Sequence, residues 1–125
     1  MPLLLLIEDN CTIRENTAEL LMLEGYTVIT ASNGVKGFEK VTQLFPDLII
    51  CDVLMPEMGG LELLGKLGLH PKLKLIPLIF YSAKSEKKDI KEGLDAGAYD
   101  YIIKPCELEN LLASIQKCCK EKNFS

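Results

Sequence analysis

The stretch Leu48-Ile49-Ile50-Cys51-Asp52 decides the fold, because an apolar run of strand length ends directly at a carboxylate. Three other apolar runs end at polar residues in the same way: Leu3–Ile7 before Glu8 and Asp9, Leu78–Tyr81 before Ser82 and Ala83, and Tyr101–Ile103 before Lys104 and Pro105. Open α/β sheets place their functional groups where strands end. The sequence therefore predicts a functional site at the ends of these strands.

The composition fits one compact domain over residues 1–125, because 48% of the residues are hydrophobic and no linker interrupts the chain. The net charge of −4 argues against the broad cationic surface that binds nucleic acid, so no direct nucleic-acid partner is expected. The run Leu3–Ile7 is too short to span a membrane and lacks the cationic flank of a signal peptide. We therefore expect a cytoplasmic protein without a membrane partner.

The five cysteines are an odd number and lack CxxC spacing, which makes a disulfide framework or a zinc site a poor interpretation. Cys51 lies in a strand that is expected to be buried on both faces, where a small core side chain fits. We expect reduced thiols at all five positions: Cys11, Cys51, Cys106, Cys118 and Cys119.

Segments of helical period alternate with the apolar runs. We expect a first helix from about Thr12 to Glu24 with Leu20 and Leu21 on its inner face, and a strand over Thr27–Thr30. A second helix should follow Ser32-Asn33-Gly34, with an apolar face that ends at Pro46 and contains Val35, Phe38, Val41 and Phe45.

The second half of the chain repeats this alternation. A short helix should carry Leu61, Leu64 and Leu67, and Ser85 should cap the next one, which Gly97 closes before a strand over Tyr99–Ile103. The last helix has the clearest apolar stripe, formed by Leu108, Leu111, Leu112, Ile115 and Cys119. Five such βα units with nearly continuous apolar strands predict a parallel sheet covered by helices on both faces.

Right-handed crossovers place the carboxyl ends of all parallel strands along one edge of the sheet. The polar residues at the strand ends therefore converge, although they span nearly the whole chain. Three carboxylates in one pocket carry a charge of −3, which Lys104 reduces to −2 and a divalent cation would neutralise. Mg²⁺ suits such a pocket, with Asp9 and Asp52 as direct ligands and Glu8 acting through water.

Asp52 is the expected nucleophile, because it stands centrally among the strand ends. A metal ion and a lysine stabilise the charge that develops during phosphoryl transfer, and Ser82 and Lys104 could both reach oxygens of a phosphoryl group on Asp52. A lone aspartate at a strand end more often bonds its own turn. The surrounding charges favour the phosphoryl-transfer interpretation here.

These residues resemble the receiver domain of two-component response regulators, in particular single-domain chemotaxis-type regulators. The resemblance covers about the whole chain and rests on four motifs: Ile7-Glu8-Asp9-Asn10, Asp52-Val53-Leu54-Met55-Pro56 with Gly60, Ser82-Ala83, and Ala96-Gly97-Ala98 leading to Tyr101 and Lys104-Pro105. It implies a flavodoxin-like doubly wound fold, with five parallel strands in the order 2-1-3-4-5 and five helices on both faces.

The resemblance also implies a role for each site residue. Asp52 would accept a phosphoryl group from a phosphohistidine of a histidine kinase or a histidine phosphotransfer protein. Such a domain is not an ordinary enzyme but assists its own phosphotransfer and dephosphorylation. The further implied roles are Mg²⁺ binding by Asp9, Asp52 and the Leu54 carbonyl with Glu8 supporting the waters, phosphoryl contacts from Ser82 and Lys104, a cis Lys104-Pro105 bond, and a rotameric switch at Tyr101.

Switching is expected to run from Asp52 to a partner-binding face. A phosphoryl group should draw Ser82 inward, and the void behind Ser82 should then admit Tyr101. The face formed by the helix after Ser85, the Tyr99–Ile103 strand and the last helix would change shape and bind an unidentified output partner. The lysines on that helix could serve that partner or be merely solvated: Lys87, Lys88 and Lys91.

The residues present argue against two other functions and leave a third one open. A flavin carrier of this fold would not place Glu8-Asp9 against a phosphate, and a haloacid-dehalogenase-type phosphatase needs an aspartate where Leu54 stands. A receiver-fold binding module that acts without phosphorylation is the remaining alternative. Its mark would be loss of Asp9, Asp52 or Lys104, and all three are present.

Overall fold

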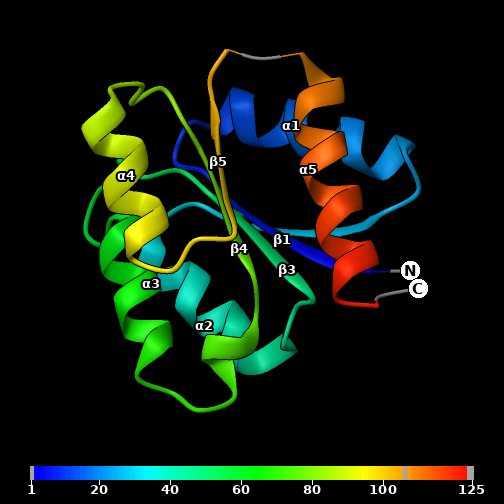
Figure 1. The fold of residues 1–125 in the computed structure, drawn as a ribbon. Helices are drawn as coiled ribbons and strands as arrows, with labels where there is room; N and C mark the ends of the chain where they lie inside the picture. Colours follow the sequence, from blue (N-terminus) through cyan, green and yellow to red (C-terminus); the bar gives the residue numbers. More distant parts are fainter. Residues whose placement is uncertain (1, 106, 124–125) are drawn as a thin grey trace.

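The computed structural model describes residues 2–105 and 107–123, so the expectation for Cys106 lies outside the described residues. Within these ranges five strands alternate with five α-helices, as Figure 1 shows. The strands are β1 (Leu3–Ile7), β2 (Thr27–Ala31), β3 (Leu48–Cys51), β4 (Leu78–Ser82) and β5 (Asp100–Ile103). The helices are α1 (Cys11–Leu23), α2 (Gly34–Leu44), α3 (Gly60–Gly68), α4 (Lys87–Asp95) and α5 (Leu108–Glu121), with a 3₁₀ turn η1 (Leu73–Leu75) before β4.

The five strands form one parallel sheet in the order β2-β1-β3-β4-β5, which confirms the predicted topology. Ile7 at the end of β1 lies opposite Ala31 of β2 and Cys51 of β3. Cys51 in turn lies opposite Phe80 of β4, two residues before that strand ends. The residues that follow β1 and β3 therefore leave the sheet side by side.

Helices cover both faces of the sheet, with α1 and α5 on one face and α2, α3 and α4 on the other (Figure 1). Successive strand residues point to opposite faces. Leu4 and Leu6 of β1 accordingly pack in the cluster that contains residues of α1 and α5, whereas Leu5 and Ile7 pack in the cluster that contains residues of α2 and α3. Both faces are buried, which explains why the inner strands are uninterrupted apolar runs.

The ends of α1 and α2 differ from the prediction. α1 begins at Cys11, because the Asn10 side chain caps it by accepting a hydrogen bond from the Ile13 N–H at 2.9 Å. Leu20 is exposed, and Leu21 alone of that pair is buried. Phe45 is not part of the apolar face of α2: it has a left-handed φ of 46° and is 55% exposed. A residue before a proline avoids the helical region, so Pro46 keeps Phe45 out of the helix, which ends at Leu44.

Details of the later elements also differ. Glu86 rather than Ser85 is the N-cap of α4, because Glu86 and Asp89 form a reciprocal capping box. In α3 the fully buried leucine beside Leu67 is Leu63, while Leu61 and Leu64 are only partly buried. The apolar stripe of α5 is confirmed at Leu111, Leu112, Ile115 and Cys119, and Cys118 adds a further buried side chain.

Two glycines of α3 give a stability test. A Cβ on Gly60 would lie 2.4 Å from the Asp52 carbonyl oxygen and 2.7 Å from Phe80, whereas a Cβ on Gly65 would have no neighbour within 4 Å. We expect Gly60→Ala to lower the free energy of unfolding by about 1–3 kcal/mol through overpacking. Gly65→Ala, the matched control, should raise it by about 0.5–1 kcal/mol through helix propensity. Urea unfolding measures both, and equal effects would contradict the close approach at Gly60.

Candidate functional site

Three carboxylates gather at the carboxyl end of the sheet. Glu8 and Asp9 follow β1, Asp52 follows β3, and one oxygen from each lies within 4.8 Å of the others. Their proximity comes from the register, since the preceding residues Ile7 and Cys51 are direct neighbours across the β1–β3 pair. The predicted convergence of these acids is therefore seen in the structure.

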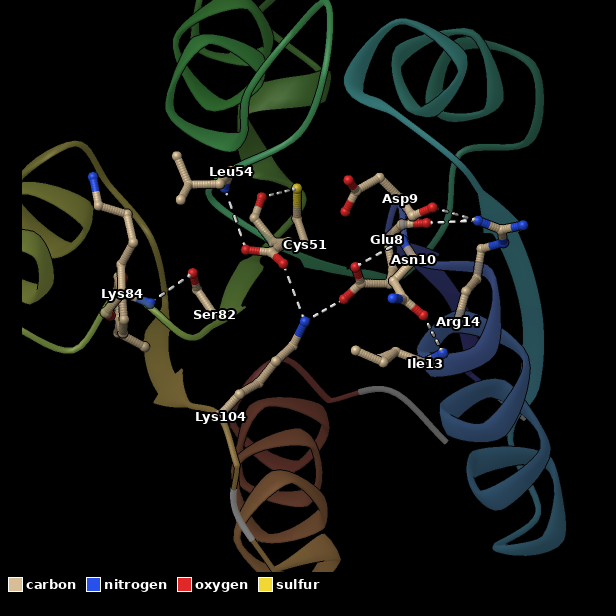
Figure 2. A network of polar contacts seen from close by, with 12 residues as sticks. Glu8, Asp9, Asn10, Ile13, Arg14, Cys51, Leu54, Ser82, Lys84 and Lys104 are labelled. Atoms are coloured by element: carbon tan, nitrogen blue, oxygen red, sulfur yellow. Dashed lines mark hydrogen bonds and ion pairs between the residues drawn. The ribbon is translucent and has the colours of Figure 1, made fainter.

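Lys104 enters this acidic group from β5, which lies two strands away from β3. Its Nζ donates to a Glu8 carboxylate oxygen and to Asp52 Oδ2, the latter at 3.1 Å (Figure 2). Its main-chain N–H donates to the Ser82 carbonyl at 2.8 Å, which ties the segment that follows β5 to the end of β4. The Lys104-Pro105 bond is cis, as predicted.

Glu8 is the most buried acid of the group, with only 3% of its surface exposed. Burial raises the pKa of Glu8, and the hydrogen bond from Lys104 opposes that rise. For Lys104, burial alone would lower the pKa, but the hydrogen bond to Glu8 and the charge of Asp52 outweigh it, so the pKa is raised. Lys104 is therefore held as a cation between two acids.

The main chain of the Glu8–Asn10 segment is also held in place. The Arg14 guanidinium donates to the Glu8 carbonyl at 2.8 Å, and the Asn10 N–H donates to Glu8 Oε2 at 3.1 Å. Sequence reasoning did not assign Asn10 or Arg14 to the site. Asn10 could have been found as an N-cap directly before a helix, but no sequence signal shows that Arg14 turns back toward carbonyl groups.

Asp52 uses its two oxygens differently. Oδ1 accepts from the Leu54 N–H at 3.2 Å, which is the local turn contact of an ordinary strand-end aspartate. Oδ2 accepts from Lys104, a residue 52 positions away in the chain. The Leu54 side chain beside this turn is exposed.

Ser82 ends β4 and Tyr101 lies in β5, the two strands beyond β3 on the Lys104 side of the sheet. Ser82 is buried, and its Oγ accepts from the Lys84 N–H at 3.2 Å, so its own proton can be donated elsewhere. Tyr101 is 8% exposed, and its hydroxyl donates to the Lys84 carbonyl at 2.7 Å. The ring is already inside, against Phe80 at a centroid distance of 5.9 Å. The part that Ser82 and Tyr101 play in switching stays a prediction.

The donor set fits a hard divalent cation. Glu8, Asp9 and Asp52 sum to −3, and Lys104 brings the total to −2. Mg²⁺ binds through one or two carboxylates and retains several waters, so three clustered carboxylates are enough to hold it. The residues are thus suited to Mg²⁺ in type and in charge.

Residues 4–116 match the family model of the response regulator receiver domain. The chain belongs to this family, as its fold and its acidic site lead one to expect. It is 33% identical to a signal receiver domain of a histidine kinase from Syntrophus aciditrophicus, covering 100% of this chain and 95% of that one with a TM-score of 0.91. It is 30% identical to the Vibrio cholerae chemotaxis protein CheY4, covering 94% and 98% with a TM-score of 0.88.

Among curated relatives, the DNA-binding dual master transcriptional regulator RpaA of Synechocystis is 34% identical over 93% of this chain and 48% of its own length. The chain spans about half the length of the first curated relatives it matches. Because one relative binds DNA, the expected absence of a nucleic-acid partner stays a prediction. In the described part of the chain, no helix is long and apolar enough to cross a membrane.

The family gives the general function. The chain is a phospho-acceptor receiver domain of two-component signalling, which is a phosphorylation-dependent switch rather than a classical enzyme. Receiver domains interact with histidine kinases or phosphotransfer proteins and generally bind Mg²⁺ at an acidic pocket. A binding module that acts without phosphorylation is not favoured.

The acidic crowding predicts an effect on stability. Without divalent cations, Asp9→Asn should raise the free energy of unfolding by about 1 kcal/mol, because it removes one of three mutually repelling charges. In saturating Mg²⁺ the wild type should be the more stable of the two proteins, because it binds the ion more tightly and gains more stability from it. Urea unfolding with and without Mg²⁺ measures this, with Glu39→Gln on exposed α2 surface as the control. An Asp9→Asn variant that is less stable in both conditions would contradict the repulsion.

Proposed function

We propose that Asp52 is the phospho-acceptor of this receiver domain and that a phosphohistidine of a histidine kinase or phosphotransfer protein is the donor. The observation that carries this proposal is the position of the Lys104 ammonium, which bonds both Glu8 and Asp52 in a group of three carboxylates. This lysine comes from the far side of β4 and places a cation directly beside the Asp52 carboxylate. A site that receives a phosphoryl group needs such a cation.

In the proposed reaction, a carboxylate oxygen of Asp52 attacks the phosphorus atom of the donor. The phosphorus–nitrogen bond breaks, its electron pair returns to the imidazole, and the imidazole nitrogen then takes up a proton. Lys104 pairs with the phosphoryl oxygens, and the Ser82 hydroxyl donates a hydrogen bond to one of them. The Leu54 N–H holds Asp52 Oδ1 in a fixed orientation during the attack. The domain thereby assists its own phosphotransfer and, with water as the attacking group, its own dephosphorylation.

Mg²⁺ is part of the same proposal. Asp9, Asp52 and the Leu54 carbonyl would be its ligands, and Glu8 would support its bound waters. When bound, the ion supplies the positive charge that lets a phosphoryl group enter a pocket of net charge −2. The assignment of Leu54 as a ligand rests on the resemblance alone.

The output is proposed to pass through the face formed by α4, β5 and α5, where Tyr101 would act as the switch toward an unidentified partner. We expect one domain over residues 1–125 that does not itself touch nucleic acid, given its net charge of −4. A cytoplasmic location is supported by the four cysteines of the described residues, which are unpaired thiols as in a reducing compartment.

The acceptor is tested by incubating the protein with Mg²⁺ and a small phosphodonor such as acetyl phosphate and then measuring its intact mass. The wild type should gain the mass of one phosphoryl group, and Asp52→Asn should gain none because an amide is a far weaker nucleophile. Omission of Mg²⁺ should suppress the gain in the wild type. Equal labelling of the wild type and Asp52→Asn would disprove the acceptor assignment.

The lifetime of the phosphoryl group is expected to be long. An apolar side chain at Leu54 hinders an in-line water, and Lys84 offers no carboxylate that would orient one. Leu54→Asn should therefore lose phosphate several-fold faster after the donor is removed, as measured by the decay of the phosphorylated mass. Leu69→Asn, at an exposed leucine beyond α3, is the control and should leave the rate unchanged. An unchanged or slower rate in Leu54→Asn would count against this role.

A further inference from the structure

Lys84 connects the proposed phosphoryl site with helix α4 through three separate groups. Its N–H donates to Ser82 Oγ at 3.2 Å, and its carbonyl accepts from the Tyr101 hydroxyl at 2.7 Å. Its ammonium forms an ion pair with Asp89 Oδ1 at 3.4 Å. The backbone of Lys84 is thus fixed beside Ser82, while its charge is directed to the first turn of α4.

The two partners of this ion pair differ in freedom. The Asp89 side chain is only 11% exposed, and its second oxygen accepts from the Glu86 N–H at 3.2 Å in the capping box of α4. The Lys84 side chain is 35% exposed and ends a flexible four-carbon stem. If the ion pair breaks, the ammonium moves and the carboxylate stays.

Lys84 lies two residues after Ser82, so its side chain starts from the same end of β4 as the proposed phosphoryl contact. In Figure 2, Ser82 and Lys84 lie on one side of the Lys104 ammonium and Glu8 and Asp9 on the other. The acid-rich side already has its cation in Lys104. A phosphoryl group on Asp52 would present further acceptor oxygens, and the side of Ser82 is where Lys84 begins.

We propose that Asp89 is a positioning residue for the phosphoryl site: it holds the Lys84 ammonium away from Asp52, and a phosphoryl group competes with Asp89 for that ammonium. This inference rests on the proposed function of Asp52. The competition favours the phosphoryl group, which carries a charge of about −2 against −1 for Asp89 and offers three acceptor oxygens. Asp89 therefore weakens phosphoryl retention, and phosphorylation releases the tie between Lys84 and α4.

The other lysine pairs of α4 cannot serve this role. Lys88 pairs with Glu86 and Lys91 pairs with Asp95, and all four side chains are largely exposed. Both partners of the Lys91–Asp95 pair lie within α4, one turn apart. This pair provides a matched control on the same helix for any change of charge at Asp89.

The test measures the affinity for beryllium fluoride, a phosphoryl-like anion, in saturating Mg²⁺. Asp89→Asn removes the charge but keeps an amide oxygen for the Glu86 N–H, so α4 keeps its cap. We expect it to bind the anion about two- to fivefold more tightly than the wild type, the range that a partly exposed ion pair supports. Lys84→Gln should bind beryllium fluoride more weakly than the wild type. Asp89→Glu keeps the carboxylate and should bind it with wild-type affinity.

The double variant decides whether Asp89 acts through Lys84. In the Lys84→Gln background, Asp89→Asn should have no further effect, whereas in the wild type it strengthens binding. Asp95→Asn should leave the affinity unchanged in both backgrounds. The inference is overturned if Asp89→Asn leaves the affinity unchanged, or if its effect persists without Lys84.

The failure of the proposed function would look different. If the wild type bound no beryllium fluoride, or bound it as well as Asp52→Asn does, the site itself would be misassigned and the role of Asp89 would fall with it. Binding that depends on Asp52 but not on Asp89 would overturn the positioning role alone.

Discussion

Electrostatic crowding at the carboxyl end of the sheet is the constraint on which the rest of the structure depends. The β1–β3 register places Glu8, Asp9 and Asp52 together, and the ammonium of Lys104 offsets only one of their three charges. Burial of Glu8 adds a desolvation cost. The fold accepts this arrangement because fixed donors surround it: the N–H groups of Asn10 and Leu54 and the ammonium of Lys104. Such strain is typical of a functional site.

Much of this site could be predicted from the sequence, because it follows from strand ends rather than from fine geometry. Apolar runs identify the strands, and right-handed crossovers bring their carboxyl ends to one edge. The polar residue that follows each run must therefore lie at that edge. This is why Glu8, Asp52, Ser82 and Lys104 were placed near one another correctly, although they span nearly the whole chain.

The features that escaped prediction depend on competition between nearly equivalent local solutions. Ser85 and Glu86 can each cap a helix, and the reciprocal bond with Asp89 decides for Glu86. Phe45 fits the helical period of α2, but the following proline overrides that period. The Tyr101 hydroxyl could have faced solvent, and the Lys84 carbonyl holds it inside. Such outcomes require backbone coordinates, because no periodicity in the sequence distinguishes them.

The β1 side of the site is held more firmly than the β4 side, and this difference determines which helix is expected to respond to phosphorylation. On the β1 side, Glu8 is buried and Arg14 holds its carbonyl. On the β4 side, contacts run through Lys84 to α4, whose one buried residue is Gly93, whereas α1 buries Thr17, Ala18 and Leu21. A helix with few buried contacts moves at low free-energy cost. A charge added at Asp52 is therefore expected to displace α4 rather than α1, since the β1 side has no comparably loose element.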